Sequence, residues 1–485
     1  MLGDEIRSAA ERFGDATVMA APDGLLTYRG LDAGSDRIAA ALWHDGLRPG
    51  DRIAMRLPSG ASYLLAYAAA AKLGAVVAGI NSGLARVEQE KLVSLVQPAV
   101  VLDSVDAVHD LQDRGRPARR ADVASDPDRL AALVFTSGTS GLPRAAMFTD
   151  AQLAAVMLVD TGGAWADHPG TPSLVSTHFA HVGPMLKLPW YLRSGLGMQV
   201  LPRWRAAEYL RLVAELRLPE IGAIPPQLAL MLATPEVDQL DLSCVRRIVA
   251  GGAASSPTLI DAVRRAFGAQ YVVRYSSTES GGVGLGTSAE SADEALYGIG
   301  RPRQGVQASI RDPDGRPLPA GEVGELCLHT PTAMVGYWRD EEATAAAFHG
   351  RWLRTGDLAA RNADGTYTLK GRLKEMYIRG GYNVYPAEVE TELARHPAVA
   401  ACAVVSRQDP TMGEIGVAVI EVKGPGPTPT LADIRGFLED RVARWKLPEE
   451  LLAVAQLPLN STHKPDRRVL TELVANRAQP GGPPR

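Results

Sequence analysis

Apolar and polar positions in the N-terminal part of the chain follow two periods in turn. Residues 37–57, 63–81 and 258–277 each begin with apolar positions at helical spacing and continue into a short apolar run typical of a strand. Helices that alternate with strands in this way are typical of parallel sheets covered by helices. We therefore expect an α/β fold with mostly parallel strands.

After Tyr297 the pattern changes to short strand-like segments separated by turns. Residues 306–319 carry the strong turn signal DPDG, and residues 321–330 form another strand-like piece. This pattern predicts a smaller β-rich subdomain that closes the large domain. Residues 104–130, in contrast, are polar, charged and poor in apolar positions, so we expect a surface excursion there.

The last hundred or so residues have the pattern of a separate small domain. Residues 386–396 predict a helix with proline in its first turn, acidic residues early and basic residues late. Two strand-like runs and a second helix from Leu431 follow. We therefore predict an N-terminal domain of residues 1–374, a C-terminal domain of residues 375–475 and a disordered tail of residues 476–485.

The charge of the chain argues against two classes of partner. A net charge of −4 with 22% charged residues gives no electrostatic reason to expect nucleic acid or a membrane surface. The longest apolar run, residues 63–80, is interrupted by Lys72 and Gly74 and is shorter than the roughly 20 residues of a membrane span. Residues 1–15 are amphipathic and of mixed charge, unlike a signal peptide. We expect a cytoplasmic protein, and a homodimer is compatible with this composition.

The three cysteines, Cys244, Cys327 and Cys402, are far apart and show no CxxC spacing. Neither a disulfide framework nor a structural zinc site is expected from them, and a reducing compartment fits best. Because the whole chain is slightly acidic, a phosphate-bearing ligand would need a local binding site.

A glycine-rich loop is the first candidate for such a site. TSGTSGLPRAA, residues 136–146, follows the apolar run AALVF and offers backbone N–H groups and hydroxyls to phosphate oxygens. It is not the common nucleoside-triphosphate loop, GxxxxGKS or GxxxxGKT, and no GxGxxG opens a helix elsewhere. Taken alone, the segment fits a mobile surface loop equally well.

Five other segments change this interpretation. TSGTSGLPRAAMFT resembles the phosphate-loop signature of the adenylate-forming superfamily, which includes acyl-CoA synthetases, adenylation domains of peptide synthetases and luciferases. Further segments resemble the family's other signatures in the family's order: YSSTES (275–280), TGDL (355–358), GRLKE (371–375), GGYNVYPAEVE (380–390) and NSTHKPDRR (460–468). The resemblance runs from the region near Thr27 to Lys464. It implies a large N-terminal domain with parallel α/β sheets and a β-rich subdomain, followed by a small mobile α+β domain.

The resemblance also implies a reaction. Enzymes of this family join a carboxylate to ATP, release pyrophosphate and leave an acyl-adenylate, and most then pass the acyl group to a thiol. This chain is expected to be an acyl-CoA synthetase, an AMP-forming carboxylate–CoA ligase, with ATP, Mg²⁺ and coenzyme A as cofactors and a small carboxylic acid as substrate. Two alternatives stay open: transfer to a carrier-protein thiol or an amine, and a degenerate nucleotide-binding protein without turnover.

Residues at the reacting centre take their roles from the matching motifs. Lys464 would bridge the attacking carboxylate and the α-phosphate, and would neutralise charge that grows in the transition state. Glu279 would ligate Mg²⁺, a hard cation that prefers oxygen, and Thr278 would contact the α-phosphate. Asp357 would accept hydrogen bonds from both ribose hydroxyls, and Arg372 would add a donor to the same sugar.

The remaining assignments cover the phosphates, the adenine, the acyl group and the hinge. The β- and γ-phosphates would lie against Thr136, Ser137, Gly138, Thr139, Ser140, Gly141 and Arg144. Adenine would stack on Tyr275 beside Gly251, Gly252 and Ser276. The acyl pocket would be lined by His178 or His181, Met185, Gly281 and Gly282. The C-terminal domain would swing about Glu375 and alternately insert Lys464 or the GGYN loop, in which Gly380 and Gly381 would flank a pantetheine tunnel.

Each role has a plain structural alternative, such as a surface lysine, a strand-end carboxylate, a turn aspartate or a core histidine. The chain also departs from the family pattern at Arg144, Asp150, Ser276, His463 and Pro465. Arg144 keeps the charge of the usual lysine but presents a planar fork. His463 and Pro465 flank Lys464, so we expect them to affect how this lysine is inserted.

Overall fold

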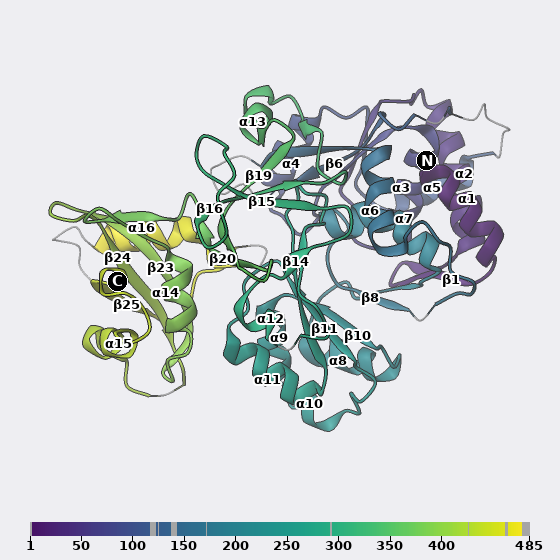
Figure 1. Ribbon diagram of the computed structural model, residues 1–485. Helices are drawn as coiled ribbons and strands as arrows, with labels where there is room; N and C mark the ends of the chain where they lie inside the picture. Colours follow the sequence, from purple (N-terminus) through teal and green to yellow (C-terminus); the bar gives the residue numbers. More distant parts are fainter. Residues whose placement is uncertain are drawn as a thin grey trace.

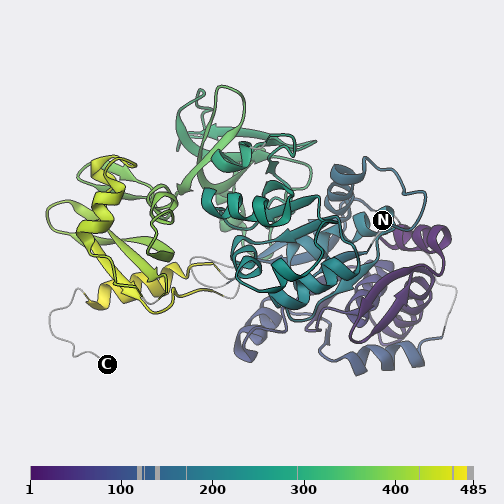
Figure 2. The same cartoon turned by 90° about the horizontal axis from the view of Figure 1, so that it is seen from below.

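The computed structural model describes residues 2–116, 123–124, 126–136, 143–170, 172–291, 293–424, 426–460 and 464–477. A large N-terminal domain and a smaller C-terminal domain lie side by side and meet near strand β20 (Tyr367–Arg372), as Figure 1 shows. Figure 2 shows the same two bodies from below. The architecture is therefore the predicted mixed α/β fold of two domains, and the boundary at residue 375 stays a prediction.

The central sheet of the N-terminal domain has the strand order β17-β7-β6-β4-β3-β5. Strands β3, β4, β5 and β6 run parallel, with β5 at one edge of the sheet, and β7 and β17 are antiparallel additions at the other edge. The strands are β3 (Arg52–Met55), β4 (Val76–Gly79), β5 (Val100–Leu102), β6 (Leu130–Phe135), β7 (Ala145–Thr149) and β17 (Gly336–Tyr337), accompanied by helices α2 (Tyr28–His44), α3 (Ala61–Leu73) and α4 (Arg86–Val96). Helix α3 is buried almost all round, which confirms the predicted buried helix followed by a strand.

The expected surface excursion after Ser104 is wrong in its first part. Helix α5 (Val105–Arg114) begins there, capped by the Ser104 hydroxyl, which accepts a hydrogen bond from the Ala107 N–H. Val108 and Leu111 are buried among the core residues of this domain. Two apolar side chains one helical turn apart are enough to pack a helix against the core when its other faces are charged. The sequence did not predict this helix because the segment contains few apolar residues.

A second sheet, β10-β11-β12-β13-β14, begins with three parallel strands and ends with antiparallel ones. The strands are β10 (Glu220–Ala223), β11 (Arg247–Gly251), β12 (Gln270–Tyr275), β13 (Leu285–Gly286) and β14 (Arg301–Pro302), with helices α8 (Ala206–Glu215), α9 (Pro225–Leu232), α10 (Glu236–Gln239), α11 (Pro257–Phe267) and α12 (Glu294–Tyr297). The residues of the two sequence motifs at Gly251 and Tyr275 thus end neighbouring parallel strands, where sites in α/β folds usually form.

A small sheet with the order β2-β1-β9-β8 completes the α/β part. It consists of β1 (Thr17–Ala21), β2 (Gly24–Thr27), β8 (Ser173–Val175) and β9 (Met198–Val200), next to helices α1 (Leu2–Phe13), α6 (Asp150–Thr161) and α7 (Val182–Ser194). Helices α6 and α7 lie side by side in the N-terminal domain (Figure 1).

The predicted β-rich subdomain is present. Its antiparallel sheet contains β15 (Gln307–Arg311), β16 (Val323–His329), β18 (Phe348–His349), β19 (Trp352–Arg361) and β20, and helix α13 (Glu341–Ala346) lies beside it. Asp357 of β19 is paired with Arg372 of β20 in the register of this sheet. Two residues from separate sequence motifs are therefore cross-strand neighbours.

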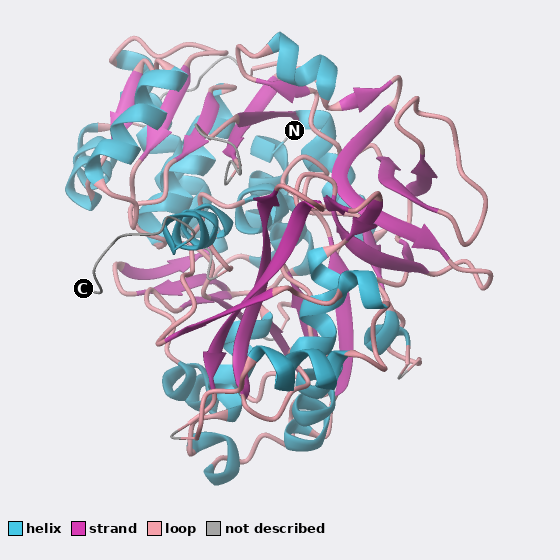
Figure 3. Ribbon diagram, turned by 90° about the vertical axis from the view of Figure 1, so that its left-hand side faces the viewer, coloured by secondary structure: helices cyan, strands magenta, loops and turns pink. Residues whose placement is uncertain are grey.

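The C-terminal domain is a five-stranded sheet with helices on both faces (Figure 3). Its elements are β21 (Tyr377–Arg379), β22 (Tyr382–Val384), α14 (Pro386–Leu393), β23 (Val399–Asp409), β24 (Gly413–Val422), α15 (Leu431–Leu438), the 3₁₀ turn η1 (Arg444–Lys446), β25 (Glu450–Val454) and α16 (Arg467–Arg477). Val404 packs with α14 and α15, whereas its neighbours Ala403 and Val405 pack with α16. The helix predicted over residues 386–396 ends earlier, at Leu393, because single turns replace it after that residue.

Within the described residues, no helix is both long and apolar enough to span a bilayer. The thiols of Cys244, Cys327 and Cys402 are all free.

Candidate active site

Three predicted nucleotide residues meet where β12 ends beside β19 and β20. The Tyr275 hydroxyl donates to Oδ2 of Asp357 at 2.6 Å, and Nε of Arg372 lies 3.1 Å from Oδ1 of the same carboxylate. Burial raises the pKa of Asp357, while Arg372 opposes this rise. A carboxylate has about four acceptor positions, so Asp357 can hold Tyr275 and still accept from two hydroxyls of a sugar.

Lys464 reaches this group from the other domain. Burial and the charge of Arg372 lower the pKa of Lys464, and Asp357 opposes that change, so the ammonium lies within electrostatic reach of both residues. The structure therefore joins Tyr275 and Arg372 through Asp357 and has Lys464 within electrostatic reach of Asp357 and Arg372.

A tight turn presents Lys464. Asn460 N–H donates to the Lys464 carbonyl at 2.8 Å, and Lys464 N–H donates to Oδ1 of Asn460 at 3.1 Å. Leu459 and Pro465 form an isolated β-bridge at the base of this turn. Pro465 therefore follows a lysine whose backbone is already held by hydrogen bonds to Asn460. His463 lies outside the described residues.

The ends of the phosphate loop are tied together. Thr136 N–H donates to the Arg144 carbonyl at 2.9 Å, which continues the β6–β7 hairpin toward the loop. Nε of Arg144 lies 3.1 Å from Oδ2 of Asp340, and its guanidinium carbon lies 5.5 Å from the ring centre of Tyr337. The predicted contacts Ser137, Gly138, Thr139, Ser140 and Gly141 lie outside the described residues.

Glu279 lies next to this loop, held by a residue that the sequence did not single out. The Tyr337 hydroxyl donates to Oε1 of Glu279 at 2.9 Å, and the Glu279 carbonyl accepts from Met334 N–H at 2.8 Å. Burial and the Glu279 charge raise the pKa of Tyr337, so its hydroxyl stays a donor. Tyr337 lies 58 residues from Glu279, in a two-residue strand too short for a pattern to show.

The residues present suit a phosphate-bound Mg²⁺ rather than a metal held by protein alone. Among the described residues, no group of three or more His, Cys, Asp or Glu side chains could hold a metal ion. Mg²⁺ commonly takes one or two carboxylates and completes its shell with phosphate oxygens and water. Glu279 is such a carboxylate, and Tyr337 donates to one of its two oxygens.

The other residues of the YSSTE segment form a compact turn. Ser277 and Ser280 exchange hydrogen bonds between backbone N–H and hydroxyl at 3.0 and 3.1 Å, and Gly281 N–H donates to the Thr278 carbonyl at 3.0 Å. The Thr278 side chain is half-buried and Ser276 is exposed. This turn fixes Glu279 in place.

Two predicted glycines border the end of β12. Gly251 pairs with Arg274, and a methyl group at Gly251 would come within 3.0 Å of the Arg274 carbonyl oxygen. Gly252 has a φ of +78°, which side chains rarely adopt. The backbone at Gly251 and Gly252 therefore passes close to β12. These two positions have no side chain that could cover Tyr275.

The two histidines predicted for the acyl pocket, His178 and His181, precede α7 and contact polar groups. The Ala180 N–H donates to Nδ1 of His178 at 3.1 Å, and Nε2 of His178 lies 3.1 Å from the Ser82 hydroxyl. Nε2 of His181 lies 3.3 Å from the side-chain amide of Asn81. Burial lowers the pKa of His178 to about 4 and also lowers that of His181. Both imidazoles are therefore neutral near pH 7.

The other residues predicted for the acyl pocket contact different parts of the structure. Met185 is fully buried and lines a small apolar cavity with Tyr63, Phe179 and Leu188. A methyl group at Gly282 would lie 3.6 Å from Val182, so the start of α7 faces this glycine. Gly281 instead packs against the backbone of Thr332, away from α7.

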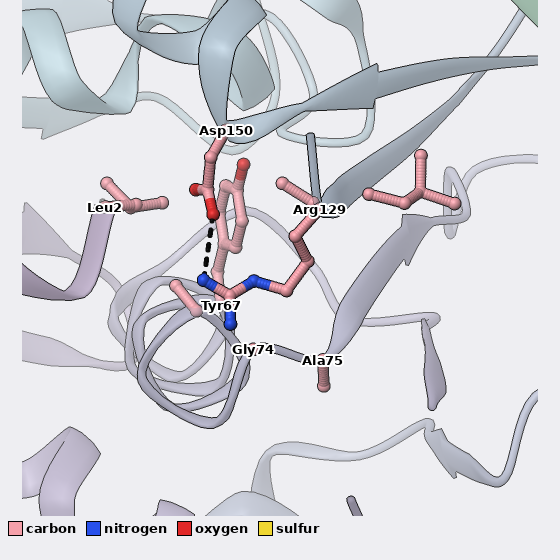
Figure 4. A pocket seen from close by; sticks show the side chains of 9 residues that line it. Leu2, Tyr67, Gly74, Ala75, Arg129 and Asp150 are labelled. Carbon is pink, nitrogen blue, oxygen red and sulfur yellow. Dashed lines mark hydrogen bonds and ion pairs between the residues drawn. The ribbon is translucent and has the colours of Figure 1, made fainter. Parts of the chain in front are cut away.

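Asp150 contributes to the packing of the N-terminal domain and lies away from the phosphate loop. It follows β7, at the opposite end of that five-residue strand from the loop, and its Oδ2 lies 3.2 Å from Nη2 of Arg129 (Figure 4). Both side chains are nearly buried, in a small cavity lined by Leu2, Tyr67, Gly74 and Ala75. The departure at Asp150 therefore forms a buried ion pair remote from the residues around Tyr275.

The predicted hinge residue, Glu375, forms an ion pair with the C-terminal domain. Glu375 Oε2 lies 3.4 Å from Nη2 of Arg467, whose Nη1 lies 2.8 Å from Oε1 of Glu390. The Gly380–Gly381 turn lies on the surface, with φ values of +54° and +86°, and joins β21 to β22. In this structure Lys464 lies at the Asp357 group, whereas the GGYN loop is exposed.

The neutral His178 predicts a loss of stability in acid. A folded-state pKa of about 4, against about 6.5 when unfolded, means that the unfolded chain binds the extra proton first. The free energy of unfolding should fall by up to about 3 kcal/mol from this group as pH drops from 7 to 4. Denaturant melts at several pH values measure it. His178→Gln should flatten that slope, and the exposed His168→Gln should not; equal slopes in all three proteins would refute the assignment.

Comparisons with known proteins agree with this geometry. The family model described as AMP-binding enzyme matches residues 6–338, and the model for the AMP-binding enzyme C-terminal domain matches residues 388–464. A fatty acid–[acyl-carrier-protein] ligase of Streptomyces coeruleorubidus is 30% identical over 92% of this chain and 91% of its own length. An indoleacetate–CoA ligase of Aromatoleum aromaticum is 30% identical over 95% of this chain and 96% of its own.

Three other matches extend the comparison. A medium/long-chain-fatty-acid–CoA ligase of Mycobacterium tuberculosis is 33% identical over 72% of this chain, and the match spans 62% of that relative's length. Among solved structures, an amide bond synthetase from Marinactinospora thermotolerans has a TM-score of 0.84 with 26% identity, covering 98% of this chain and 100% of that one. ATP-bound MatB from Rhodopseudomonas palustris has a TM-score of 0.88 with 24% identity over 99% of this chain and 100% of its own, which shows the shared fold.

Proposed function

The chain belongs to the AMP-binding enzyme family of the adenylate-forming superfamily, and we propose that it activates a carboxylic acid as an acyl-adenylate and passes the acyl group to coenzyme A. Ligase chemistry of the adenylating kind is common to its relatives, but their printed acceptors differ: coenzyme A, an acyl carrier protein, or an amine in an amide bond synthetase. The coenzyme A step is therefore the finer part of the proposal.

One observation carries the first half of the proposal: Lys464 of the C-terminal domain lies within electrostatic reach of Asp357 and Arg372. A carboxylate and a triphosphate repel each other, so a fixed cation between them lowers the barrier as charge grows on the α-phosphate. The Lys464 ammonium would bridge the two anions, and Asp357 with Arg372 would hold the ribose beside it. The Tyr275 ring, fixed through its hydroxyl, would support the adenine.

The other end of the triphosphate would lie near Glu279. Mg²⁺ bound there would offset negative charge on the phosphates. On this chain, Tyr337 orients the Glu279 carboxylate, and Arg144 adds a positive charge beside Tyr337. The exposed Ser276 adjoins Tyr275 at the edge of this site.

The second half would require the C-terminal domain to turn about Glu375. In the structure, Glu375 pairs with Arg467 while Lys464 lies within electrostatic reach of Asp357 and Arg372. A second pose would replace Lys464 by the turn of Gly380 and Gly381, beside which the pantetheine arm would enter. This exchange would use one cleft for two reactions.

Pyrophosphate release from Mg-ATP tests the function. The assay would compare short-chain, aromatic, long-chain and polycyclic acids with and without coenzyme A. We expect release that depends on one class of acid and accelerates when coenzyme A is present. Release that coenzyme A leaves unchanged would favour a carrier-protein thiol or an amine as acceptor. A protein that binds ATP but releases no pyrophosphate with any acid would instead be a nucleotide-binding protein without turnover.

Gly381→Val should separate the two half reactions. Valine is strained at a φ of +86°, so the β21–β22 turn would reshape while the fold stays intact. We expect steady-state thioester formation to fall at least about tenfold, because a misplaced turn impairs positioning. Acid-dependent exchange of pyrophosphate into ATP should be unchanged.

Gly424→Val is the matched control, because Gly424 has a similar φ of +67° and lies at the far end of β24. It should leave both half reactions intact. Equal thioester formation by wild type and Gly381→Val would remove this turn from the proposal.

A further inference from the structure

Helix α7 leads from the predicted acyl pocket to a group of basic side chains. Its first residue, Val182, faces Gly282 of the loop that follows Glu279. Lys187 lies five residues further along the helix, roughly 7 to 8 Å at 1.5 Å per residue. The helix thus connects the part of the site near Glu279 with Lys187.

Lys187 and Arg303 both pair with one acid, Asp160, and Arg274 lies within electrostatic reach of Asp160 and Arg303; we call these four residues the distal cluster. Nζ of Lys187 lies 3.9 Å from Oδ2 of Asp160, whose Oδ1 pairs with the Arg303 guanidinium. Arg274 adjoins this pair through its charge: burial and the charge of Arg303 lower the pKa of Arg274, and Asp160 opposes that change. The cluster therefore draws on α6, α7, β12 and the segment that follows β14.

The backbone ties the distal cluster to the nucleotide site. Arg274 directly precedes Tyr275 on β12, and its Nη1 donates to the Thr287 carbonyl at 3.2 Å. Arg303 N–H donates to the Gly284 carbonyl at 3.0 Å, two residues after Gly282. Successive side chains of a strand point to opposite faces, so β12 presents Tyr275 to one side and Arg274 to the other.

The charges in this region do not balance. Glu220 also acts on Lys187 and Arg274, but its carboxylate pairs with Arg247 at 3.2 Å. Arg247 and Glu220 pair at the surface, so the partly buried cluster holds three basic side chains, Lys187, Arg274 and Arg303, against one acid, Asp160. A surplus of positive charge in a poorly hydrated place is costly unless an anion approaches it.

Protein surrounds Lys187, but solvent still reaches part of its side chain. Burial lowers the pKa of its ammonium, yet 33% of its side chain is accessible, as are 22% of Asp160 and 20% of Arg303. Solvent therefore reaches part of each of these three side chains. Trp190 on the same helix adds an aromatic wall, 5.9 Å from Nζ of Lys187.

We propose that the distal cluster forms the far end of the acyl pocket and binds a second, terminal carboxylate of the substrate. This inference rests on the proposed function and narrows it: the preferred acids are dicarboxylates whose second group reaches Lys187, Arg274 and Arg303. Guanidinium groups match carboxylates in planar, two-point contacts. An alkyl end placed there would instead leave the surplus charge buried and unpaired.

The test compares α,ω-dicarboxylates with straight-chain monocarboxylates of matched length, using acid-dependent exchange of pyrophosphate into ATP to obtain kcat/KM. Wild type should prefer the dicarboxylate of one length by about 10- to 100-fold, the value of one hydrogen bond to a charged group. Lys187→Met keeps the length of the side chain and removes its charge, and it should lower this ratio at least about tenfold. Arg301→Met, on the same β14 segment but paired with Glu294 outside the cluster, should keep the wild-type ratio.

Calorimetric binding of the same dicarboxylate without ATP reports on the pocket independently of turnover, and it should weaken in Lys187→Met and not in Arg301→Met. Equal or better use of monocarboxylates by wild type, with a ratio unchanged in Lys187→Met, would overturn the inference and leave adenylation intact. Binding that depends on Lys187 without any exchange would support the pocket and overturn the proposed function. Absence of both binding and exchange would overturn both.

Discussion

Lys464→Ala will lower the rate of acyl-adenylate formation by about 100- to 1,000-fold, the usual effect of removing one preorganised electrostatic contact to the transition state. The backbone of Lys464 is hydrogen-bonded to Asn460, and its ammonium lies within electrostatic reach of Asp357 and Arg372. Rapid-quench measurement of acyl-adenylate in a single turnover gives this rate directly.

Two controls make the Lys464 result specific. Lys423→Ala removes an exposed lysine of the same domain and should keep the wild-type rate. Binding of ATP should change little in Lys464→Ala, because Asp357, Arg372 and Tyr275 remain in place. In wild type, the rate should fall as pH rises through the lowered pKa of Lys464, at lower pH than an ordinary lysine would titrate. A variant that forms the adenylate at the wild-type rate would remove Lys464 from the mechanism.

Glu279→Gln will lower kcat by about 100-fold and raise the Mg²⁺ concentration needed for half-maximal rate. The amide keeps an oxygen that can accept from the Tyr337 hydroxyl, so the shape of the turn is preserved while the negative charge is lost. A hard divalent cation binds a neutral amide oxygen less well than a carboxylate. Initial rates over a Mg²⁺ titration at fixed ATP measure both changes.

Tyr337→Phe separates the charge of Glu279 from its orientation. It removes one hydrogen bond at 2.9 Å, so we expect a loss of about three- to tenfold with a nearly unchanged Mg²⁺ requirement. If Glu279→Gln and Tyr337→Phe gave the same small loss, Glu279 would be a structural carboxylate at the end of a strand, and the metal would be bound elsewhere.

The sequence alone predicted, from contiguous motifs, that residues far apart along the chain form one site. Tyr275, Asp357, Arg372 and Lys464 each stand in a recognisable segment, and the structure brings them together. The sequence also predicted the alternation of helices and strands in the N-terminal domain. Each of these segments is long enough to show the hydrophobic period of its helix or strand. Helix α5 was missed because only two buried side chains, Val108 and Leu111, distinguish it from a polar loop.

Residues that act through tertiary contacts could not be found in this way. Tyr337 belongs to a two-residue strand, and its contact with Glu279 depends on the pairing of β17 with β7. Lys187, Arg274 and Arg303 belong to three separate elements, and each taken singly resembles an ordinary surface or helix residue. Only the fold shows that Lys187 and Arg303 share one acid, Asp160, and that Arg274 lies within electrostatic reach of it.

The most direct test of the account is exchange of labelled pyrophosphate into ATP, without coenzyme A, in wild type, Lys464→Ala and Gly381→Val. We predict exchange that requires an acid in wild type, persists in Gly381→Val and is lost in Lys464→Ala. Exchange that persists in Lys464→Ala, or that no acid elicits in wild type, would contradict the claim that this chain forms an acyl-adenylate through Lys464.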